Sequence, residues 1–388
     1  MIGQRPAPNG RPAGDGPGAV VISGVAAVTA AGRTAAQALA AAVRGEPAFG
    51  PVRRFDVSGR RVRVAATLPG TPVLTDELAD TVDSACAQAG LTADERAECP
   101  LLLAVHDDPR LARAPREQRV GRGPGGLAED LAARCGLATA TAYTSACVAA
   151  TTAVADAGAM LALRRAERIV VAAGYLVDPD QFALFDAGRA LAADGEVRPF
   201  SAGRKGLLLG DGVAAMVLET EVAARRRGAP VLARLAGWGR AGDAYHVCQP
   251  RPDGAGLARA IDAALRRAGV APDEVGYVNA HGSGTVYSDA AEAAALHRAF
   301  GPAAATVPVS STKSTHGQSL EASGLVELVI TVLALRDGVL PVNAGFLGAD
   351  AECPLDVITS PREARPRFAL SLNAAFGGAN TALLVGAR

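Results

Sequence analysis

The sequence predicts an α/β fold, and two observations support this class. Short runs of aliphatic and β-branched residues alternate with longer Ala-rich runs along most of the chain. Each half of the chain also contains an apolar run, then a turn that bears polar residues, then an Ala-rich run. This alternation of strand-like and helix-like segments is typical of sheets that are buried beneath helices.

The expected strands are short and apolar. The first begins at Ala19 and consists of a β-branched run that we expect Gly24 to end. The further expected strands span residues 101–105, 168–173, 214–218, 275–279 and 368–372. The expected helices span residues 34–44, 75–89, 148–165, 256–268 and 325–335.

Two halves are expected to follow a short tail. Residues 1–18 are rich in Pro and Gly and contain no apolar stretch of the kind a signal sequence has, so we expect a disordered tail. Residues 221–230 are charged and end in Gly and Pro turn residues, which makes this segment the natural joint. We therefore expect an N-terminal half at 19–222 and a C-terminal half at 223–388. The halves match too weakly for the pattern alone to establish a duplication.

Composition excludes several classes of function. Lys plus Arg and Asp plus Glu both number 39, so the formal net charge is zero and nothing favours binding to nucleic acid or an anionic membrane. The basic cluster at 225–227 precedes a glycine and is typical of a solvated helix end. No uninterrupted apolar run is long enough to cross a bilayer. The six cysteines are scattered singly, which indicates reduced thiols in a cytoplasmic protein, without a zinc site or a disulfide framework.

Cys147 is the strongest candidate for a chemical role. It lies in Thr-Ser-Ala-Cys-Val-Ala-Ala, between an extended-looking run at 139–144 and a run of small residues at 148–163. This pattern predicts a strand, a tight turn and a buried helix with Cys147 near its N-terminus. Because a helix N-terminus stabilises a thiolate, the thiol is placed where it can act as a nucleophile. The alternative is an inert core cysteine.

Two further motifs place polar groups beside apolar runs. Tyr-Val-Asn-Ala-His-Gly-Ser-Gly-Thr at 277–285 puts His281 after a strand, at the edge of the sheet where ligand sites of α/β proteins collect. His281 is a candidate base or hydrogen-bond donor, or else a histidine satisfied by a backbone carbonyl. Val-Ser-Ser-Thr-Lys-Ser-Thr-His-Gly-Gln at 309–318 contains Lys313, which is either buried and paired with Glu327 or an exposed loop lysine.

Two glycine-rich motifs complete the set. The glycines clustered within 198–212 allow a ligand to approach the backbone or the chain to turn tightly. No GxxxxGK[ST] occurs, and the run at 121–126 lacks the strand and helix that a dinucleotide site needs. Ser-Leu-Asn-Ala-Ala-Phe-Gly-Gly-Ala-Asn at 371–380 predicts two strands around a glycine turn, in which Phe376 gates a pocket or plugs a hairpin.

Together and in this order, the motifs resemble those of the β-ketoacyl-(acyl-carrier-protein) synthases, the elongating ketosynthases of fatty-acid and polyketide assembly. The motifs that match are Ser-Ala-Cys, Arg-Pro-Phe, Asn-Ala-His-Gly-Ser-Gly-Thr, Ser-Ser-Thr-Lys-Ser and Phe-Gly-Gly-Ala-Asn. The resemblance extends from about residue 19 to the end of the chain. It implies a thiolase-like fold, in which two similar α/β halves form a five-layered α-β-α-β-α core, normally as a dimer.

The resemblance also implies roles for individual residues. Cys147 would accept an acyl group from a phosphopantetheine thiol, and His281 would help to decarboxylate a malonyl thioester and polarise its carbonyl. The resulting enolate would attack the acyl-cysteine. Backbone N–H groups of Cys147 and Phe376 would form the oxyanion hole. The other implied residues are the supporting pair Lys313 and Glu327, the pantetheine-binding hydroxyls of Ser283 and Thr285, and Phe185 in the acyl pocket.

The sequence departs from the family at the second catalytic histidine. The family has Gly-His where this chain has Gly317-Gln318, so Gln318 becomes the third expected catalytic residue. Its amide donates a hydrogen bond but carries neither a proton nor a positive charge. His316 lies two residues earlier, an offset that changes its direction in a loop. A related class of initiating condensing enzymes uses an amide side chain in this role.

Three functions stay open at this point. The first is a condensing enzyme that loads an acyl group on Cys147 and performs decarboxylative Claisen condensation, in fatty-acid or polyketide-type specialised biosynthesis. The second is a non-decarboxylating ketosynthase-like acyltransferase or cyclase. The third is a non-catalytic partner like the chain-length factors, which typically lack the cysteine. We expect no bound cofactor or metal, substrates on the phosphopantetheine of an acyl carrier protein, and a homodimer or a heterodimer with a second ketosynthase-like chain.

Overall fold

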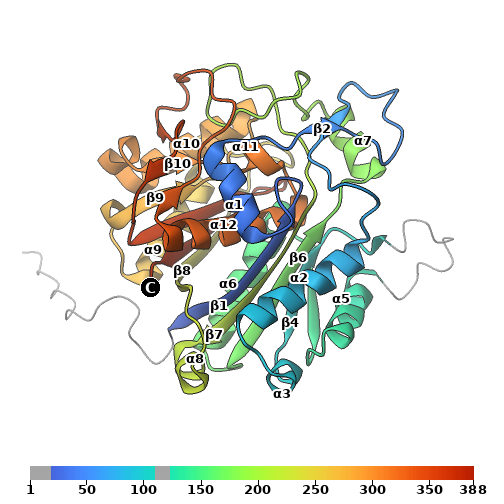
Figure 1. The fold of residues 1–388 in the computed structure, drawn as a ribbon. Helices are drawn as coiled ribbons and strands as arrows, with labels where there is room; N and C mark the ends of the chain where they lie inside the picture. Colours follow the sequence, from blue (N-terminus) through green and yellow to red (C-terminus); the bar gives the residue numbers. More distant parts are fainter. Residues whose placement is uncertain (1–18, 110–122) are drawn as a thin grey trace, which may run out of the picture.

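A sheet of eleven strands runs through the computed structural model, which describes residues 19–109 and 123–388 (Figure 1). The expected tail at 1–18 lies outside the described residues. In spatial order the strands are β12 (Asp356–Val357), β10 (Pro308–Ser310), β9 (Val275–Asn279), β14 (Phe368–Ala374), β15 (Ala379–Gly386), β8 (Ala233–Gly242), β1 (Val20–Thr29), β7 (Gly212–Thr220), β6 (Arg168–Tyr175), β4 (Leu101–Val105) and β5 (Ala140–Tyr143). Two small ribbons pair β2 (Gly50–Pro51) with β3 (Val64–Ala65) and β11 (Val339–Leu340) with β13 (Arg362–Glu363). The predicted α/β class is therefore confirmed.

The two halves of the sheet have the same topology. In the first half β5, β4 and β6 are parallel neighbours, and β7 and β1 follow as antiparallel strands. In the second half β10, β9 and β14 are parallel neighbours, and β15 and β8 follow as antiparallel strands. Equivalent strands also come in the same order along the chain. The duplication that is weak in the sequence is thus plain in the strand order.

Antiparallel pairing of β1 with β8 joins the halves, with Val20 opposite Leu235. Between the halves, α8 (Glu221–Arg227) leads from β7 to β8 and ends at Gly228, whose positive φ of 66° suits a glycine. This helix lies within the expected joint. We propose that the boundary between the halves falls here, at residues 222 and 223.

The helices complete a five-layered α-β-α-β-α arrangement. The middle layer is formed by α6 (Ala149–Ala162) and α12 (Ser323–Asp337), which contact strands of both halves and each other. On one outer face, α2 (Leu74–Gln88) and α5 (Gly123–Arg134) cover the first half, and on the other α9 (Ala255–Ala268) and α10 (Val286–Phe300) cover the second (Figure 1). In the described part of the chain, the other helices and 3₁₀ turns are α1 (Ala35–Arg44), α3 (Ala93–Ala97), α7 (Pro179–Ala187), α11 (Lys313–His316), η2 (Ala146–Val148), η3 (Pro272–Glu274), η4 (Gly301–Ala305) and η5 (Leu320–Ala322).

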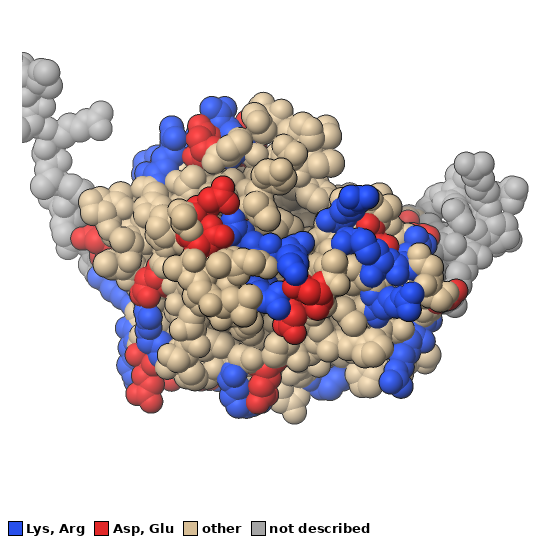
Figure 2. Space-filling model, turned by 90° about the horizontal axis from the view of Figure 1, so that it is seen from above, with Lys and Arg blue, Asp and Glu red and all other residues tan. Residues whose placement is uncertain are grey.

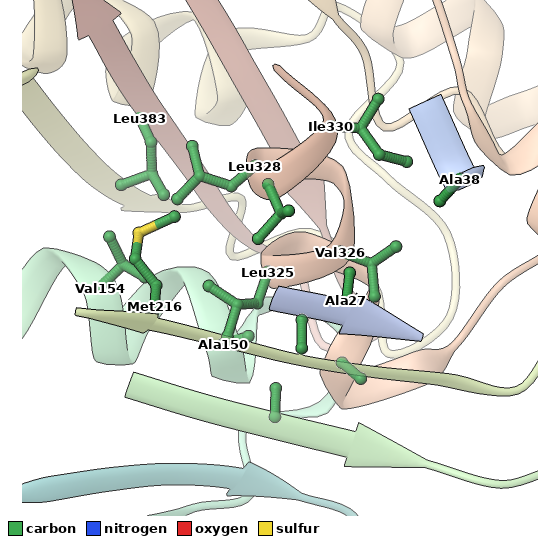
Figure 3. Packing of buried hydrophobic residues seen from close by; sticks show 14 of the residues in the cluster. Ala27, Ala38, Ala150, Val154, Met216, Leu325, Val326, Leu328, Ile330 and Leu383 are labelled. Atoms are coloured by element: carbon green, nitrogen blue, oxygen red, sulfur yellow. The ribbon is translucent and has the colours of Figure 1, made fainter. Parts of the chain in front are cut away.

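The middle layer is buried because its helices are apolar on nearly every side. Residues 323–335 of α12 are all buried. Figure 3 shows Leu325 and Val326 of this helix in the same cluster as Val154 of α6, Met216 of β7 and Leu383 of β15. A helix that is apolar all round is stable only when elements pack on every side of it, as they do here.

One expected boundary is wrong. The first strand does not end at Gly24 but continues to Thr29, with a register shift between Ile22 and Gly24. A Cβ atom at Gly24 would lie 2.2 Å from the carbonyl oxygen of Ala85 in α2. The glycine therefore lets a helix approach the strand closely, and it marks an irregularity in the strand instead of its end.

Candidate active site

The residues predicted to act in chemistry follow the C-terminal ends of strands in both halves. Cys147 follows β5, His281 follows β9, Gln318 follows β10 and Phe376 follows β14. They meet at a cavity of ≈ 390 Å³. Seven of the predicted residues line this cavity: Cys147, Phe185, His281, Ser283, Thr285, Gln318 and Phe376.

Cys147 lies in a strained turn. It belongs to the 3₁₀ turn η2, directly before α6, and the preceding residue Ala146 has a φ of 51°. Non-glycine residues adopt this conformation at a cost, and such strain collects at functional sites. The half-buried thiol is thereby presented to the cavity.

The environment of Cys147 works against its ionisation. Burial, the largest cause, and the carboxylate of Glu321 raise the pKa of the thiol to about 12, although the ammonium group of Lys313 opposes them. The placement near a helix N-terminus therefore does not by itself produce a thiolate at neutral pH. Formation of the nucleophile has to be coupled to a proton acceptor or to donors around the sulfur.

Gln318 supplies one such donor. Its Nε2 atom donates a hydrogen bond to the Sγ atom of Cys147 at 3.5 Å, and its Oε1 atom accepts one from Ser323 Oγ at 2.5 Å. Backbone hydrogen bonds from Gln318 N to Leu208 O (2.8 Å) and from Gly210 N to Gln318 O (2.9 Å) hold the residue. Gln318, the residue at which the sequence departs from the resembled family, thus contacts the Cys147 sulfur.

His281 is buried at the wall of the cavity. Its backbone N–H and that of Gly282 each donate to one carboxyl oxygen of Glu292, both at 2.7 Å. Burial and the nearby charge of Lys313 lower its pKa well below the usual value, so the imidazole is neutral. The Nδ1 atom is buried and has no hydrogen-bond partner among the described residues.

Lys313 and Glu327 lie behind the cavity as a buried ion pair. Lys313 Nζ is 2.5 Å from Glu327 Oε1 and donates to the carbonyl oxygen of His281 at 2.7 Å. Asn373 Nδ2 donates to the other carboxyl oxygen of Glu327 at 2.9 Å. The alternative of an exposed loop lysine is wrong, since only 1% of the Lys313 side chain is exposed.

Two buried carboxyl groups of α10 shape the loop that holds His281. Asp289 accepts hydrogen bonds from Gly284 N at 3.1 Å and Phe200 N at 2.8 Å, and Glu292 holds the preceding residues. Burial raises the pKa of Asp289 to about 7 and that of Glu292 to about 8. Both residues lie just beyond the motif at 277–285, and only the structure shows which N–H groups they bind.

The cavity entrance combines hydroxyls with an aromatic pair. Ser283 Oγ lies 2.9 Å from Thr285 Oγ1. The ring of Phe185 in α7 stacks on that of Phe376, with centroids 5.9 Å apart and planes at 20°. Phe185 is buried, whereas Phe376 is 54% exposed and precedes Gly377, whose φ is 87°.

Basic residues lie at the same cavity. Arg189 and Lys205 both line it. Figure 2 shows Lys and Arg side chains gathered beside a hollow on the upper face of the molecule. His316, whose offset in the sequence argued against it as a substitute for the family's histidine, does not line the cavity: its Nε2 atom lies 3.0 Å from Thr312 Oγ1, and burial lowers its pKa to about 3.

Sequence reasoning missed three residues near the nucleophile. Cys248 is exposed and lines the same cavity, although the chain pattern singles out only Cys147. His106 follows β4 and its Nδ1 atom lies 3.0 Å from Glu321 Oε1, in the turn η5 that contacts η2. Ser323 Oγ donates a hydrogen bond to Gln318 Oε1. No spacing in the sequence marks these residues, because their place near Cys147 results from the packing of turns that are far apart along the chain.

Two further properties concern the described residues, 19–109 and 123–388. No helix there has the length and apolar character that crossing a membrane requires. In the same ranges, no group of three or more His, Cys, Asp or Glu side chains is arranged so that it could hold a metal ion.

Comparison with protein families identifies both halves. Residues 106–224 match the model for the N-terminal domain of β-ketoacyl synthases, and residues 232–347 match that for the C-terminal domain. Together these segments cover more than half of the chain.

Individual proteins give the same result. Over 243 residues the chain is 41% identical to nodulation protein E of Rhizobium meliloti, covering 62% of this chain and 60% of that protein. Over 207 residues it is 39% identical to 3-oxoacyl-[acyl-carrier-protein] synthase 2 of Staphylococcus aureus, covering 52% of this chain and 51% of that protein. The aligned region therefore spans between half and two thirds of these relatives.

A solved structure extends the likeness to nearly the whole fold. The ishigamide ketosynthase/chain length factor superposes with a TM-score of 0.86 at 28% identity, covering 95% of this chain and 99% of that chain. This likeness confirms the thiolase-like architecture expected from the motifs.

Proposed function

Because the chain belongs to the β-ketoacyl synthase family, we propose that it is a condensing enzyme that builds a carbon–carbon bond on a carrier-bound thioester. The observation that supports this most directly is the cavity in which the Cys147 sulfur, the Gln318 amide and the neutral His281 imidazole meet. A nucleophile, a fixed neutral donor and a neutral imidazole are the groups that acyl transfer and enolate formation require.

The first step is acyl transfer. The Cys147 sulfur attacks the carbonyl carbon of an acyl thioester, and backbone N–H groups of Cys147 and Phe376 stabilise the oxyanion. The carbon–sulfur bond to the carrier then breaks, and the departing pantetheine thiol takes the proton that Cys147 loses. Because burial raises the pKa of Cys147 to about 12, the Gln318 donor lowers the barrier by supporting charge on the sulfur as the proton leaves.

The second step forms the new bond. A malonyl thioester loses carbon dioxide, and the charge that develops on its carbonyl oxygen is stabilised by donors from His281 and Gln318. The enolate carbon attacks the acyl carbonyl carbon on Cys147, and the Cys147 sulfur leaves as a thiolate that is reprotonated. Lys313 and Glu327 act from behind by fixing the His281 loop.

Substrate delivery follows from the cavity entrance. We place the pantetheine arm against Ser283 and Thr285, with Arg189 and Lys205 near its phosphate. The substrates are thus carried by an acyl carrier protein, and no cofactor is bound permanently. The enzyme works in the cytoplasm as a homodimer, or as a heterodimer with a second ketosynthase-like chain.

One observation favours a second candidate function. Gln318 is a neutral donor, and charge-assisted hydrogen bonds are roughly twice as strong as neutral ones. A non-decarboxylating acyltransferase or cyclase would use Cys147 without needing that extra stabilisation. A chain-length-factor-like subunit is disfavoured, because Cys147 is present and lines the cavity.

The test combines two measurements on the same samples. Intact mass after incubation with acyl-carrier protein reports acyl loading, and labelled carbon dioxide from malonyl-carrier protein reports decarboxylation. Cys147→Ala is expected to abolish loading, whereas the matched change Cys248→Ala in the same cavity leaves it intact. If Cys147 accepts an acyl group but no acyl primer leads to carbon dioxide release, the condensing function is wrong and the acyltransferase function is supported.

A further inference from the structure

We infer that Ser323 is a positioning residue that fixes the Gln318 side chain with its NH₂ group facing the Cys147 sulfur. Ser323 is the first residue of α12. Its Oγ atom lies 2.7 Å from Ser319 N and 2.5 Å from Gln318 Oε1. The inference therefore concerns a third side chain, behind the two that face the substrate.

The hydrogen-bond chemistry of the hydroxyl sets the direction of the amide. A backbone N–H only donates, so Ser323 Oγ accepts from Ser319 N. The single hydrogen of the hydroxyl is then available for Gln318, and it needs an acceptor. Oε1 is the acceptor of the amide, so Nε2 has to point the other way, toward Cys147 Sγ at 3.5 Å. With the amide reversed, the hydroxyl hydrogen of Ser323 would lose Oε1, the one acceptor that it has among the described residues.

The surroundings leave this arrangement little freedom. Gln318, Ser319 and Ser323 are all buried. A Cβ atom at Gly212 would lie 2.4 Å from Ser319 Oγ, so the turn before α12 packs tightly against β7. A free glutamine side chain has several rotamers, and restricting it before the substrate arrives removes an entropic cost from the reaction.

The consequence is a donor whose strength does not change with pH. A histidine in this place would gain and lose charge, whereas an amide held by a hydroxyl stays neutral across the range in which proteins are stable. The effect on condensation rests on the proposed function. The effect on the reactivity of the Cys147 sulfur does not, because it can be measured without any carrier-bound substrate.

The test is a double-mutant cycle of wild type, Ser323→Ala, Gln318→Ala and the double variant. Alkylation of Cys147 by iodoacetamide is followed by peptide mass spectrometry, beside labelled carbon dioxide release and the melting temperature. Ser371→Ala is the matched control, because Ser371 is equally buried and its hydroxyl has no hydrogen-bond partner among the described residues. It removes the same group from the same core without touching Gln318.

We expect Ser323→Ala to slow alkylation by about two- to fourfold, as Gln318→Ala does, since one neutral donor to the sulfur is lost. The double variant is expected to be no slower than the slower single variant, because Ser323 acts through Gln318. Carbon dioxide release should fall in the same non-additive way. Effects that add up in the double variant, or a Ser323→Ala protein that behaves like Ser371→Ala, would overturn the inference.

The role of Ser323 can still be tested if Ser323→Ala does not fold or if wild type releases no carbon dioxide. If Ser323→Ala does not fold, Ser323→Thr and Ser323→Val replace it, since they differ only in a hydroxyl and a methyl group. Threonine is expected to stay near wild type and valine to resemble Gln318→Ala; equal rates would refute the positioning role. If wild type releases no carbon dioxide, the condensing function fails, and the alkylation cycle still decides the role of Ser323.

Discussion

The side-chain ammonium group of Lys313 donates to the backbone carbonyl oxygen of His281 at 2.7 Å. This bond links two sequence motifs that lie 32 residues apart, and the same ammonium group is paired with buried Glu327. The position of His281 is thus tied to the buried pair of Lys313 and Glu327.

Loss of Lys313 is therefore expected to destabilise the fold as well as the site. Lys313→Met leaves Glu327 buried without its cation, which costs about 3–5 kcal/mol of unfolding free energy. Urea denaturation measures this cost, and the exposed Lys205→Met on the cavity rim serves as the control. Lys313→Met/Glu327→Gln should recover much of the loss; equal destabilisation in both proteins would show that the charge is not the cause.

Stability is expected to fall as the pH rises toward 8. Burial raises the pKa of Asp289 to about 7 and of Glu292 to about 8, above unfolded values of about 3.9 and 4.3. Between these limits the folded protein binds more protons than the unfolded chain, so each group lowers the unfolding free energy by up to about 1.4 kcal/mol per pH unit.

Substitution of these carboxyl groups tests the sign of the effect. Glu292→Gln is expected to flatten the dependence of unfolding free energy on pH, even though its NH₂ group cannot accept one of the two backbone hydrogen bonds from the His281 loop. Glu129→Gln removes an exposed carboxyl of α5 and should leave the slope unchanged. Urea titrations from pH 5 to 8 measure the slope, and a stability that rises over this range would contradict the assignment.

The first cysteine to be alkylated is expected to be Cys248. It is exposed, whereas burial raises the pKa of Cys147 to about 12. Cysteine reactivity follows access and thiolate fraction. Peptide mass spectrometry after limited iodoacetamide treatment should show Cys248 modified before Cys147, and Cys248→Ala should abolish the fast phase. Faster labelling of Cys147 would show that donors around its sulfur outweigh burial.

Phe376 is expected to limit which acyl groups reach Cys147. Its ring stacks on Phe185 at 5.9 Å, and the pair lies at the cavity. Phe376→Ala should accelerate the loading of bulky acyl groups more than that of acetyl, since the side chain alone is removed and the backbone N–H stays. Tyr287→Ala, another exposed aromatic residue at the cavity, is the control. Equal acceleration for all chain lengths would refute a gating role.

The strand and helix positions could largely be predicted, because buried segments carry an apolar pattern that survives in the sequence. The strands at 101–105 and 275–279 have the expected bounds. The role of Gly24 could not be predicted from the sequence, because it depends on how closely α2 packs on the strand. The individual motifs suggested where chemistry occurs, while Ser323, Cys248 and His106 became visible only when separate turns were brought together.

The proposed active site takes residues from both halves of the duplicated sheet, so its geometry depends on how the two halves are aligned. The sulfur belongs to the first half and its amide donor to the second, so the 3.5 Å contact between them spans the seam. The pairing of β1 with β8 and the packing of α6 against α12 hold the two halves in place relative to each other. A displacement of about 1 Å at a reacting group can cost a hundredfold in rate. Substitutions in the buried contacts between the halves, far from the cavity, should therefore lower the rate of the proposed reaction before they unfold the protein.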